Sequence, residues 1–133
     1  MKTSYLKKLR LLLLCLTIAF VCQSCLVSRC KRPQIIGYIY DLENRKPIEN
    51  CLVGESLTDK NGYFQLKELR YSQLTFLGYE APPLQVNESV YKEGYDKKTI
   101  ELFNPFGGGN RKGTVHNVDT IFLKKTLILP AFK

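Results

Sequence analysis

The sequence has little of what a metal centre or an acid–base catalyst needs. Histidine occurs once, at His116. One imidazole cannot form a histidine-rich metal site, and an acid–base pair would need a placed partner that the spacing does not show. No segment repeats with a fixed period either. These absences argue against a histidine-based metalloenzyme and against a repeat architecture.

Acidic residues are missing from the first 24 positions, which hold four of the chain's 20 Lys and Arg residues. The formal net charge of +8 therefore falls to +4 once residues 1–24 are set aside. The remaining charges alternate in sign and form no basic stripe, which is typical of a solvated surface. We therefore expect no nucleic-acid partner. The 133 residues leave room for one domain behind a leader.

A short apolar run dominates this leader. Residues 1–10 are basic, and residues 11–21 form an almost unbroken apolar stretch of 11 residues. A membrane-spanning helix needs roughly 20 apolar residues, so this stretch is too short to cross a bilayer comfortably. A basic region followed by an apolar run and small residues is typical of a secretory signal peptide. The sequence therefore predicts an exported protein whose signal peptide covers residues 1–24.

The segment Cys22-Gln23-Ser24-Cys25 resembles a bacterial lipobox, in which a small residue precedes the lipidated cysteine. Cys25 is the expected attachment site, although Cys22 stands where the pattern prefers leucine. A diacylated and N-acylated cysteine buries several dozen methylene groups at about 0.8 kcal/mol each, which anchors a protein durably. Ordinary secretion and an uncleaved anchor are the alternatives.

Two further cysteines remain in the exported chain if Cys25 carries the lipid. Cys30 falls within a short basic tether at residues 25–33, and Cys51 falls at an expected strand. A disulfide between them is permitted in an oxidising compartment. Two free or buried thiols are the alternative, and the sequence leaves both open.

The exported chain contains several short β-branched or aromatic segments separated by turn residues. Within residues 63–66, Phe64 and Leu66 are expected to point inward, and the preceding Asn61-Gly62 pair predicts a hairpin turn. Short strands at such spacing predict an all-β sandwich over residues 34–126, followed by an apolar tail at 127–133. The expected strands are residues 34–40, 51–53, 63–66, 74–77, 84–86, 99–103 and 119–123, with an exposed connection at 87–98 and a glycine loop at 106–113.

An ordered set of short motifs resembles the carboxypeptidase regulatory-like domain. The resemblance implies that family's transthyretin-like (prealbumin-like), seven-stranded β-sandwich, and it covers roughly residues 35–80, with Cys51 where alanine is usual. Similar modules occur in lipoproteins and outer-membrane receptors of the Bacteroidetes type, so the resemblance implies that setting as well. The motifs are G-x-I-x-D at Gly37–Asp41, the pair Pro47-Ile48, T-D-x-x-G-x-F at Thr58–Phe64, and the pair Gly78-Tyr79.

Three patterns invite a catalytic or ion-binding interpretation, and each has a plainer one. Residues 107–114 are glycine-rich, but their lysine precedes the last glycine, which is not the order of a phosphate loop. Residues 57–68 align with a calcium loop, but its first position is Leu57, which has no side-chain oxygen. Cys51 and His116 could imitate a thiol dyad, although a small buried thiol suits Cys51 better. We expect no cofactor and no metal.

Tyrosines supply the expected contact surface, because tyrosine and arginine are common energetic centres of interfaces. The leading hypothesis is a non-catalytic envelope lipoprotein that binds another envelope protein or a glycan. A small thiol- or histidine-dependent hydrolase and a structural spacer without a specific ligand are the alternatives. The tether lacks the acidic residues that resemble a surface-export signal in this group, so we expect the outer membrane, facing the periplasm. The tyrosines are Tyr71, Tyr79, Tyr91 and Tyr95.

Overall fold

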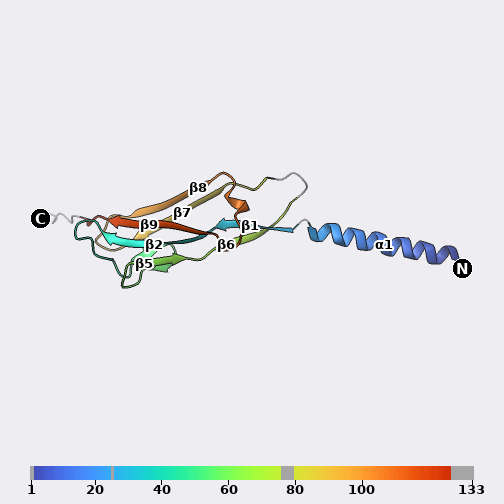
Figure 1. Ribbon diagram of the computed structural model, residues 1–133, viewed down its shortest axis with the longest axis horizontal. Coiled ribbons are helices and arrows are strands. Elements are labelled where there is room, and N and C mark those ends of the chain that lie inside the picture. The colour runs from blue at the N-terminus through green and yellow to red at the C-terminus, as the bar shows by residue number, and fades with distance from the viewer. Residues whose placement is uncertain (1, 25, 76–79, 127–133) are drawn as a thin grey trace, which may run out of the picture.

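The protein consists of an N-terminal helix and a β-sandwich that lies beyond its C-terminal end (Figure 1). The computed structural model describes all residues except 1, 25, 76–79 and 127–133. Helix α1 spans Lys2–Ser24 and projects away from the strands. Among the described residues, no helix combines the length and apolar character needed to cross a membrane. The predicted signal segment is therefore helical in the structure, while the cysteine proposed to carry lipid lies outside the described residues.

A three-stranded sheet with the order β5-β2-β9 forms one layer of the sandwich. Its central strand β2 (Gln34–Asp41) pairs with β5 (Tyr63–Leu66) in antiparallel fashion and with β9 (Val115–Leu123) in parallel. Alternating burial along β2 follows from the period of two in a strand that covers a core with one face. This layer confirms the expected strands at 34–40 and 63–66, and it lengthens the last expected strand toward its N-terminus.

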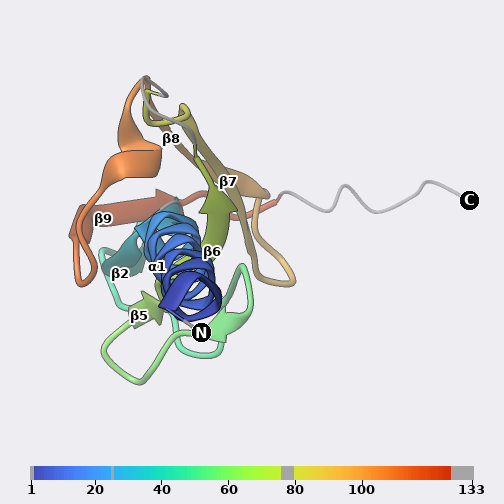
Figure 2. The same ribbon diagram turned by 90° about the vertical axis from the view of Figure 1, so that its right-hand side faces the viewer.

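A four-stranded antiparallel sheet with the order β4-β3-β7-β8 forms the opposite layer (Figure 2). The expected exposed connection at 87–98 is wrong in its first part, because β7 runs on to Tyr91 against β8. Val90 is fully buried at this point, which explains why the strand continues. The four strands are β3 (Leu52–Val53), β4 (Ser56–Leu57), β7 (Leu84–Tyr91) and β8 (Lys98–Asn104).

The core lies between these two layers and consists of apolar side chains from both. Phe64 is the largest of them and is 1% exposed. Each fully buried side chain of this kind contributes about 2 kcal/mol of transfer free energy to folding. The core residues are Cys30, Ile35, Ile39, Ile48, Cys51, Val53, Phe64, Leu66, Leu84, Val86, Val90, Ile100 and Leu123.

Gly37 lies in the middle of β2, where the close approach of β9 leaves no room for a side chain. Strand β9 carries an irregularity beside it, where Asp119 has a φ of 55°. A Cβ atom on Gly37 would lie 2.7 Å from Cγ2 of Val118 and 2.9 Å from the carbonyl oxygen of Asp119. The parallel pairing of β2 with β9 therefore depends on the missing side chain at this position.

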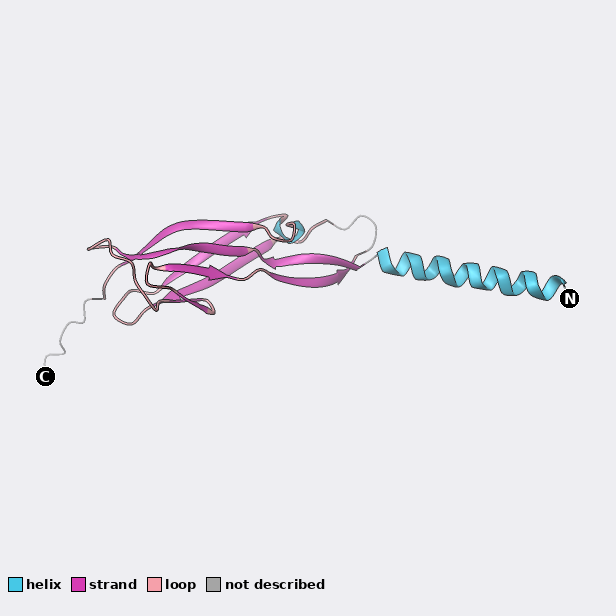
Figure 3. Cartoon of the chain, turned by 60° about the horizontal axis from the view of Figure 1, so that its bottom comes forward, coloured by secondary structure: helices cyan, strands magenta, loops and turns pink. Residues whose placement is uncertain are grey.

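A two-stranded ribbon, β1 (Leu26–Arg32) and β6 (Leu69–Leu74), connects the sandwich to α1 (Figure 3). Residues 26–32, expected to be a tether, instead form an ordered strand that contacts β7. The expected strand at 74–77 lies largely outside the described residues, and the strand found here ends at Leu74. The sequence did not reveal this ribbon because each of its strands is held mainly by the other, across a long loop.

Arg32 fixes the base of this ribbon to the sandwich. Its residue is 4% exposed, and its guanidinium pairs with the carboxylates of Glu55 and Glu88. The distance from its Nη1 to Oε1 of Glu88 is 2.5 Å, and its Nε and Nη2 also donate to the carbonyl oxygen of Lys67. Glu88 lies on β7, Glu55 in the turn between β3 and β4, and Lys67 directly after β5, so one buried cation joins β1 to the four-stranded layer and to the link between β5 and β6.

The predicted tight turn before β5 is confirmed, but it is not a hairpin turn, because β4 and β5 on either side of it pair in different sheets. Gly62 has a φ of 74°, a conformation that glycine adopts without strain. The carboxylate of Asp59 accepts hydrogen bonds from the backbone N–H groups of Asn61 (2.8 Å) and Tyr63 (2.9 Å). The calcium-like spacing therefore corresponds to a turn in which this carboxylate binds backbone amides.

The expected glycine loop is more ordered than the sequence suggested. Gly107–Gly109 form the short 3₁₀ helix η1, and Gly107 and Gly108 are buried. A Cβ on Gly108 would lie 2.6 Å from the ring Cγ of Pro82, and one on Gly107 would lie 2.5 Å from Cβ of Leu84. These glycines are therefore required for close contact with the chain entering β7, not for cradling a phosphate.

Candidate binding surfaces

Four aromatic rings gather on the outer surface of the three-stranded sheet, and we call them the aromatic face. Tyr38 and Tyr40 point outward from β2 because Ile39 between them points into the core. Tyr63 lies opposite Tyr38 on β5, and Phe122 lies opposite Tyr40 on β9. The register of three strands thus places four rings together, one from each outer strand and two from the centre.

These rings contact one another at tilted angles. The ring centroids of Tyr38 and Tyr63 are 5.4 Å apart with an angle of 58° between the rings. Tyr40 lies 6.5 Å from both Tyr38 and Phe122, at 71° in each case. Such edge-to-face pairs contribute about 1 kcal/mol each beyond area burial. The rings thus restrict one another's orientation through these contacts. The face remains accessible to solvent, since Tyr38 is 41% exposed.

Arg45 adds a cation at one end of the aromatic face. Its Cζ lies 4.3 Å from the ring centroid of Phe122, which is within the range of a cation–π contact. Arg45 has a φ of 58°, and its backbone N–H donates to the carbonyl oxygen of Asp41. The loop geometry therefore directs this side chain over the sheet instead of leaving it extended in solvent.

Asp41 stabilises the loop that carries Arg45. Its carboxylate is buried and accepts hydrogen bonds from the N–H groups of Glu43 and Asn44 and from the hydroxyl of Tyr95. Burial alone would raise the pKa of Asp41, but these hydrogen bonds and the ammonium of Lys125 outweigh it and hold that pKa below its usual value. Asp41 is therefore a positioning carboxylate that stays ionised.

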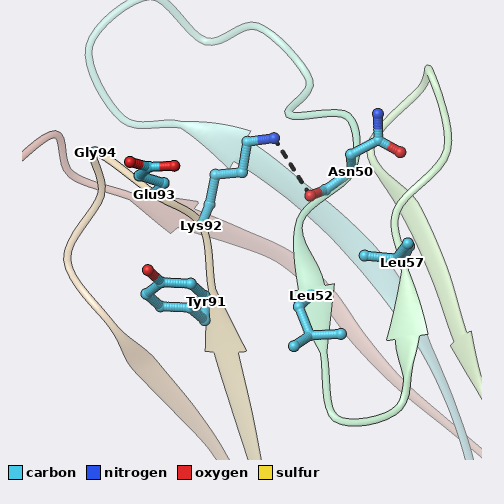
Figure 4. Close-up of a pocket in the computed structure, with 7 residues that line it drawn as sticks. All are labelled: Asn50, Leu52, Leu57, Tyr91, Lys92, Glu93 and Gly94. Atoms are coloured by element: carbon cyan, nitrogen blue, oxygen red, sulfur yellow. Dashed lines mark hydrogen bonds between the residues drawn. The ribbon is translucent and has the colours of Figure 1, made fainter.

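A shallow hollow of about 710 Å³, open to solvent, lies over one end of the four-stranded sheet (Figure 4). Leu52 is paired with Leu57 on one side and with Tyr91 on the other, so three outward side chains form an apolar row. Lys92 closes one end, where its Nζ donates to the carbonyl oxygens of Glu49 and Asn50. The hollow offers apolar area with a polar rim.

Of the four tyrosines predicted as one contact surface, the three that the structure describes lie apart from one another. Tyr71 belongs to the β1–β6 ribbon, and Tyr91 lines the hollow. Tyr95 packs against the core and donates its hydroxyl to Asp41, and burial together with that carboxylate raises the pKa of Tyr95. Tyr79 lies outside the described residues. The structure therefore brings together a different set of aromatic side chains from the one that composition suggested.

The aromatic face had a partial signal in the sequence. Strict alternation in residues 34–40 already places Tyr38 and Tyr40 on the same side of one strand. Their neighbours could not be found in this way, because pairing Tyr63 and Phe122 with β2 requires the register of two other strands. Arg45 was hidden for a further reason, since a left-handed loop residue directs it toward the sheet.

Both remaining cysteines are buried free thiols, so the disulfide that the sequence left open is not formed in the structure. Cys30 is 2% exposed in β1, and Cys51 is fully buried just before β3. Burial raises the pKa of each thiol, and Cys51 Sγ donates to the carbonyl oxygen of Tyr91 at 3.4 Å. His116 lies exposed on β9 in the other sheet, so the structure assembles no dyad of Cys51 with His116.

Iodoacetamide should leave Cys30 and Cys51 unmodified in the folded protein. Only a thiolate reacts, and both thiols combine burial with a raised pKa. The measurement is mass spectrometry of tryptic peptides after alkylation at pH 8, with the same reaction in urea as the control that modifies both. Rapid modification of Cys51 in the folded state would contradict this expectation and revive the thiol-hydrolase alternative.

The described residues contain no group of three or more His, Cys, Asp or Glu side chains that could hold a metal ion. Comparison with known proteins identifies no relative, since no family model, curated protein or solved structure matches the chain. The two candidate binding surfaces, the aromatic face and the hollow, lie on opposite layers of the sandwich.

Proposed function

We propose that this chain is a non-catalytic, lipid-anchored envelope protein whose β-sandwich binds another envelope protein through the aromatic face. The observation that carries the proposal is the group of four interlocked rings with Arg45 over one of them. Tyrosine and arginine dominate the energetics of protein interfaces because they bury much area with few rotatable bonds. In this proposal Cys25 carries the lipid, and the domain lies on the outer membrane facing the periplasm, since the residues that follow Cys25 lack an acidic surface-export signal.

The arrangement of the rings favours a protein over a glycan as the partner. A sugar ring stacks best on a flat aromatic surface, whereas neighbouring rings here make angles of 58° to 71° with each other. A protein partner can insert side chains between ring edges and donate hydrogen bonds to the tyrosine hydroxyls. Glycan binding is the second candidate, supported by the exposed ring of Tyr38.

The strand arrangement supports a domain of the carboxypeptidase regulatory-like type. Apart from the β1–β6 ribbon, the sandwich has three strands in one layer and four in the other, in the described part of the chain. Seven strands agree with the transthyretin-like fold that the resemblance implies. The motif glycines Gly37 and Gly62 also have structural reasons to be glycine in this arrangement.

Crosslinking in intact cells, followed by purification of the membrane fraction and mass spectrometry, tests the proposal. The double variant Tyr38→Ala/Tyr40→Ala should lose most of the captured partner, because two or more central hot-spot residues cost about 2 kcal/mol each. Leu57→Ser, on the opposite layer, should retain it. The Cys25→Ala variant serves as the mislocalised control.

A partner captured equally by wild type and the double variant would show that the aromatic face is not the docking surface. Loss of the partner only in Leu57→Ser would assign binding to the hollow. If no protein is captured, binding of the purified domain to a polysaccharide array would favour the glycan. Absence of both kinds of binding would leave the structural spacer.

A further inference from the structure

The β1–β6 ribbon ends in an exposed apolar pair next to residue 25, the proposed site of the lipid anchor. Leu26 lies directly opposite Leu74, and the two residues are 62% and 58% exposed. Helix α1 ends at Ser24, so this pair lies at the end of the ribbon that faces α1 (Figure 1). We call Leu26 and Leu74 the ribbon tip. Neither side chain belongs to the described core of the sandwich.

Along β6, the side chains on the face of Leu74 become more polar from the ribbon tip toward the sandwich. On the same face, the next pair is Ser28 with Ser72, and the following pair is Cys30 with Arg70. Arg70 donates from Nε to the hydroxyl of Ser28 at 2.9 Å and from Nη2 to its carbonyl oxygen at 3.0 Å. At about 3.3 Å per residue, the backbone of Arg70 lies about 13 Å from the tip. This order matches the passage from acyl chains through the interface to the headgroups.

Positive charge lies beside the ribbon at that same level. Arg70 donates from Nη1 to the carbonyl oxygen of Asn110 (3.0 Å), which places the segment after it next to β6. Arg111 and Lys112 follow in this segment and are exposed. Exposed cations near an anionic lipid surface contribute about 1 kcal/mol each, so these charges complement a membrane.

We propose that the ribbon tip inserts into the lipid surface that holds the anchor, with Arg111 and Lys112 at the headgroups. The inference rests on the proposed lipid anchor at Cys25. Because residue 26 already belongs to β1, the membrane contact is transmitted through a hydrogen-bonded ribbon and not through a flexible linker. The buried guanidinium of Arg32 at the base then fixes the orientation of the sandwich relative to the membrane.

Tryptophan fluorescence tests this contact directly, because the natural sequence contains no tryptophan. The lipidated protein carrying Leu74→Trp is purified from membranes and reconstituted into phosphatidylcholine–phosphatidylglycerol vesicles with or without a doxyl-labelled lipid. Leu57→Trp is the matched control, since Leu57 is also 58% exposed but lies beside the hollow. We expect a blue-shifted emission that the doxyl label quenches at least about twofold for Leu74→Trp and no quenching for Leu57→Trp.

The two proposals fail in distinguishable ways in this experiment. Flotation of the vesicles reports the anchor, and Cys25→Ala should remain unbound. If both tryptophan variants float but Leu74→Trp emits like an exposed indole without quenching, the tip inference is wrong and the anchor stands. If neither floats, both are wrong. Blue-shifted emission of Leu74→Trp without vesicles would also overturn the inference, because it would mean that a second copy of the chain covers the tip.

Discussion

Replacing Arg32 with methionine should lower the free energy of unfolding by about 3 kcal/mol or more. The substitution keeps an apolar stem in β1 but leaves the carboxylates of Glu55 and Glu88 without their cation. The carbonyl oxygen of Lys67 also loses its two donors. The carboxylate of Glu88, whose side chain is 18% exposed, then stays partly desolvated without its cation, whereas Glu55 at 57% exposure can be solvated by water. Urea denaturation followed by circular dichroism measures the loss.

The effect of Arg32→Met should depend on pH in a defined direction. The hydrogen bond and charge of Arg32 hold the pKa of Glu55 below its usual value. The contribution of this pair is therefore fully present above the unfolded pKa of glutamate and disappears as pH falls through the lower folded pKa. The stability gap between wild type and Arg32→Met should narrow below about pH 4.

Lys31→Met is the matched control for Arg32→Met, since it removes a positive charge from an exposed neighbouring position on the same strand. It should change stability by about 0.5 kcal/mol or less. Equal losses in the two variants, or a gap that stays constant with pH, would mean that the buried network does not hold the ribbon to the sandwich.

The substitution Gly62→Ala should destabilise the protein by about 3 kcal/mol. A Cβ at this position would lie 2.4 Å from the carbonyl oxygen of Ile39, which belongs to the central strand and cannot move freely. The carbonyl oxygen of Gly62 also accepts a hydrogen bond from the backbone N–H of Ile39 at 2.8 Å. A backbone shift that relieves the clash would therefore break this hydrogen bond. Thermal denaturation at neutral pH measures the change.

Gly113→Ala separates steric overlap from backbone strain. Gly113 has a φ of 83°, close to that of Gly62, but nothing lies within 4 Å of a Cβ built on it. Gly113→Ala should therefore lower the free energy of unfolding only by the backbone strain of alanine at positive φ, about 1 kcal/mol. If the two alanine variants lose the same stability, close contact with Ile39 does not explain the glycine in the T-D-x-x-G-x-F motif.

Sequence reasoning succeeded where the chemistry is local. The turn from Asp59 to Gly62 specifies its own conformation, because a carboxylate and a glycine within a few residues satisfy the backbone. The strands around residues 34–40, 63–66 and 99–103 follow from alternation and β-branched composition. The division into two layers then follows from burying one face of each strand.

It failed where a residue is defined by distant partners. Arg32 was taken for part of a basic tether, since its partners Glu55 and Glu88 come from other elements. Residues 87–91 look polar because one face of β7 is solvated, and the pairing with β8 cannot be seen in composition. The aromatic face depends on strand register, which a single strand does not specify.

The parallel pairing of β2 with β9 has a consequence for the order in which the sandwich can fold. Gln34 on β2 lies opposite Val115 on β9, so β2 can pair on this side only after the last strand of the chain has been added to the sheet. Leu123, which is fully buried, completes the core at the same moment. A chain whose last strand has not yet joined the sheet therefore exposes one edge of β2 and an incomplete interior. The N-terminal part therefore cannot close into a stable domain ahead of the rest, which is the property that the proposed export of an unfolded chain requires.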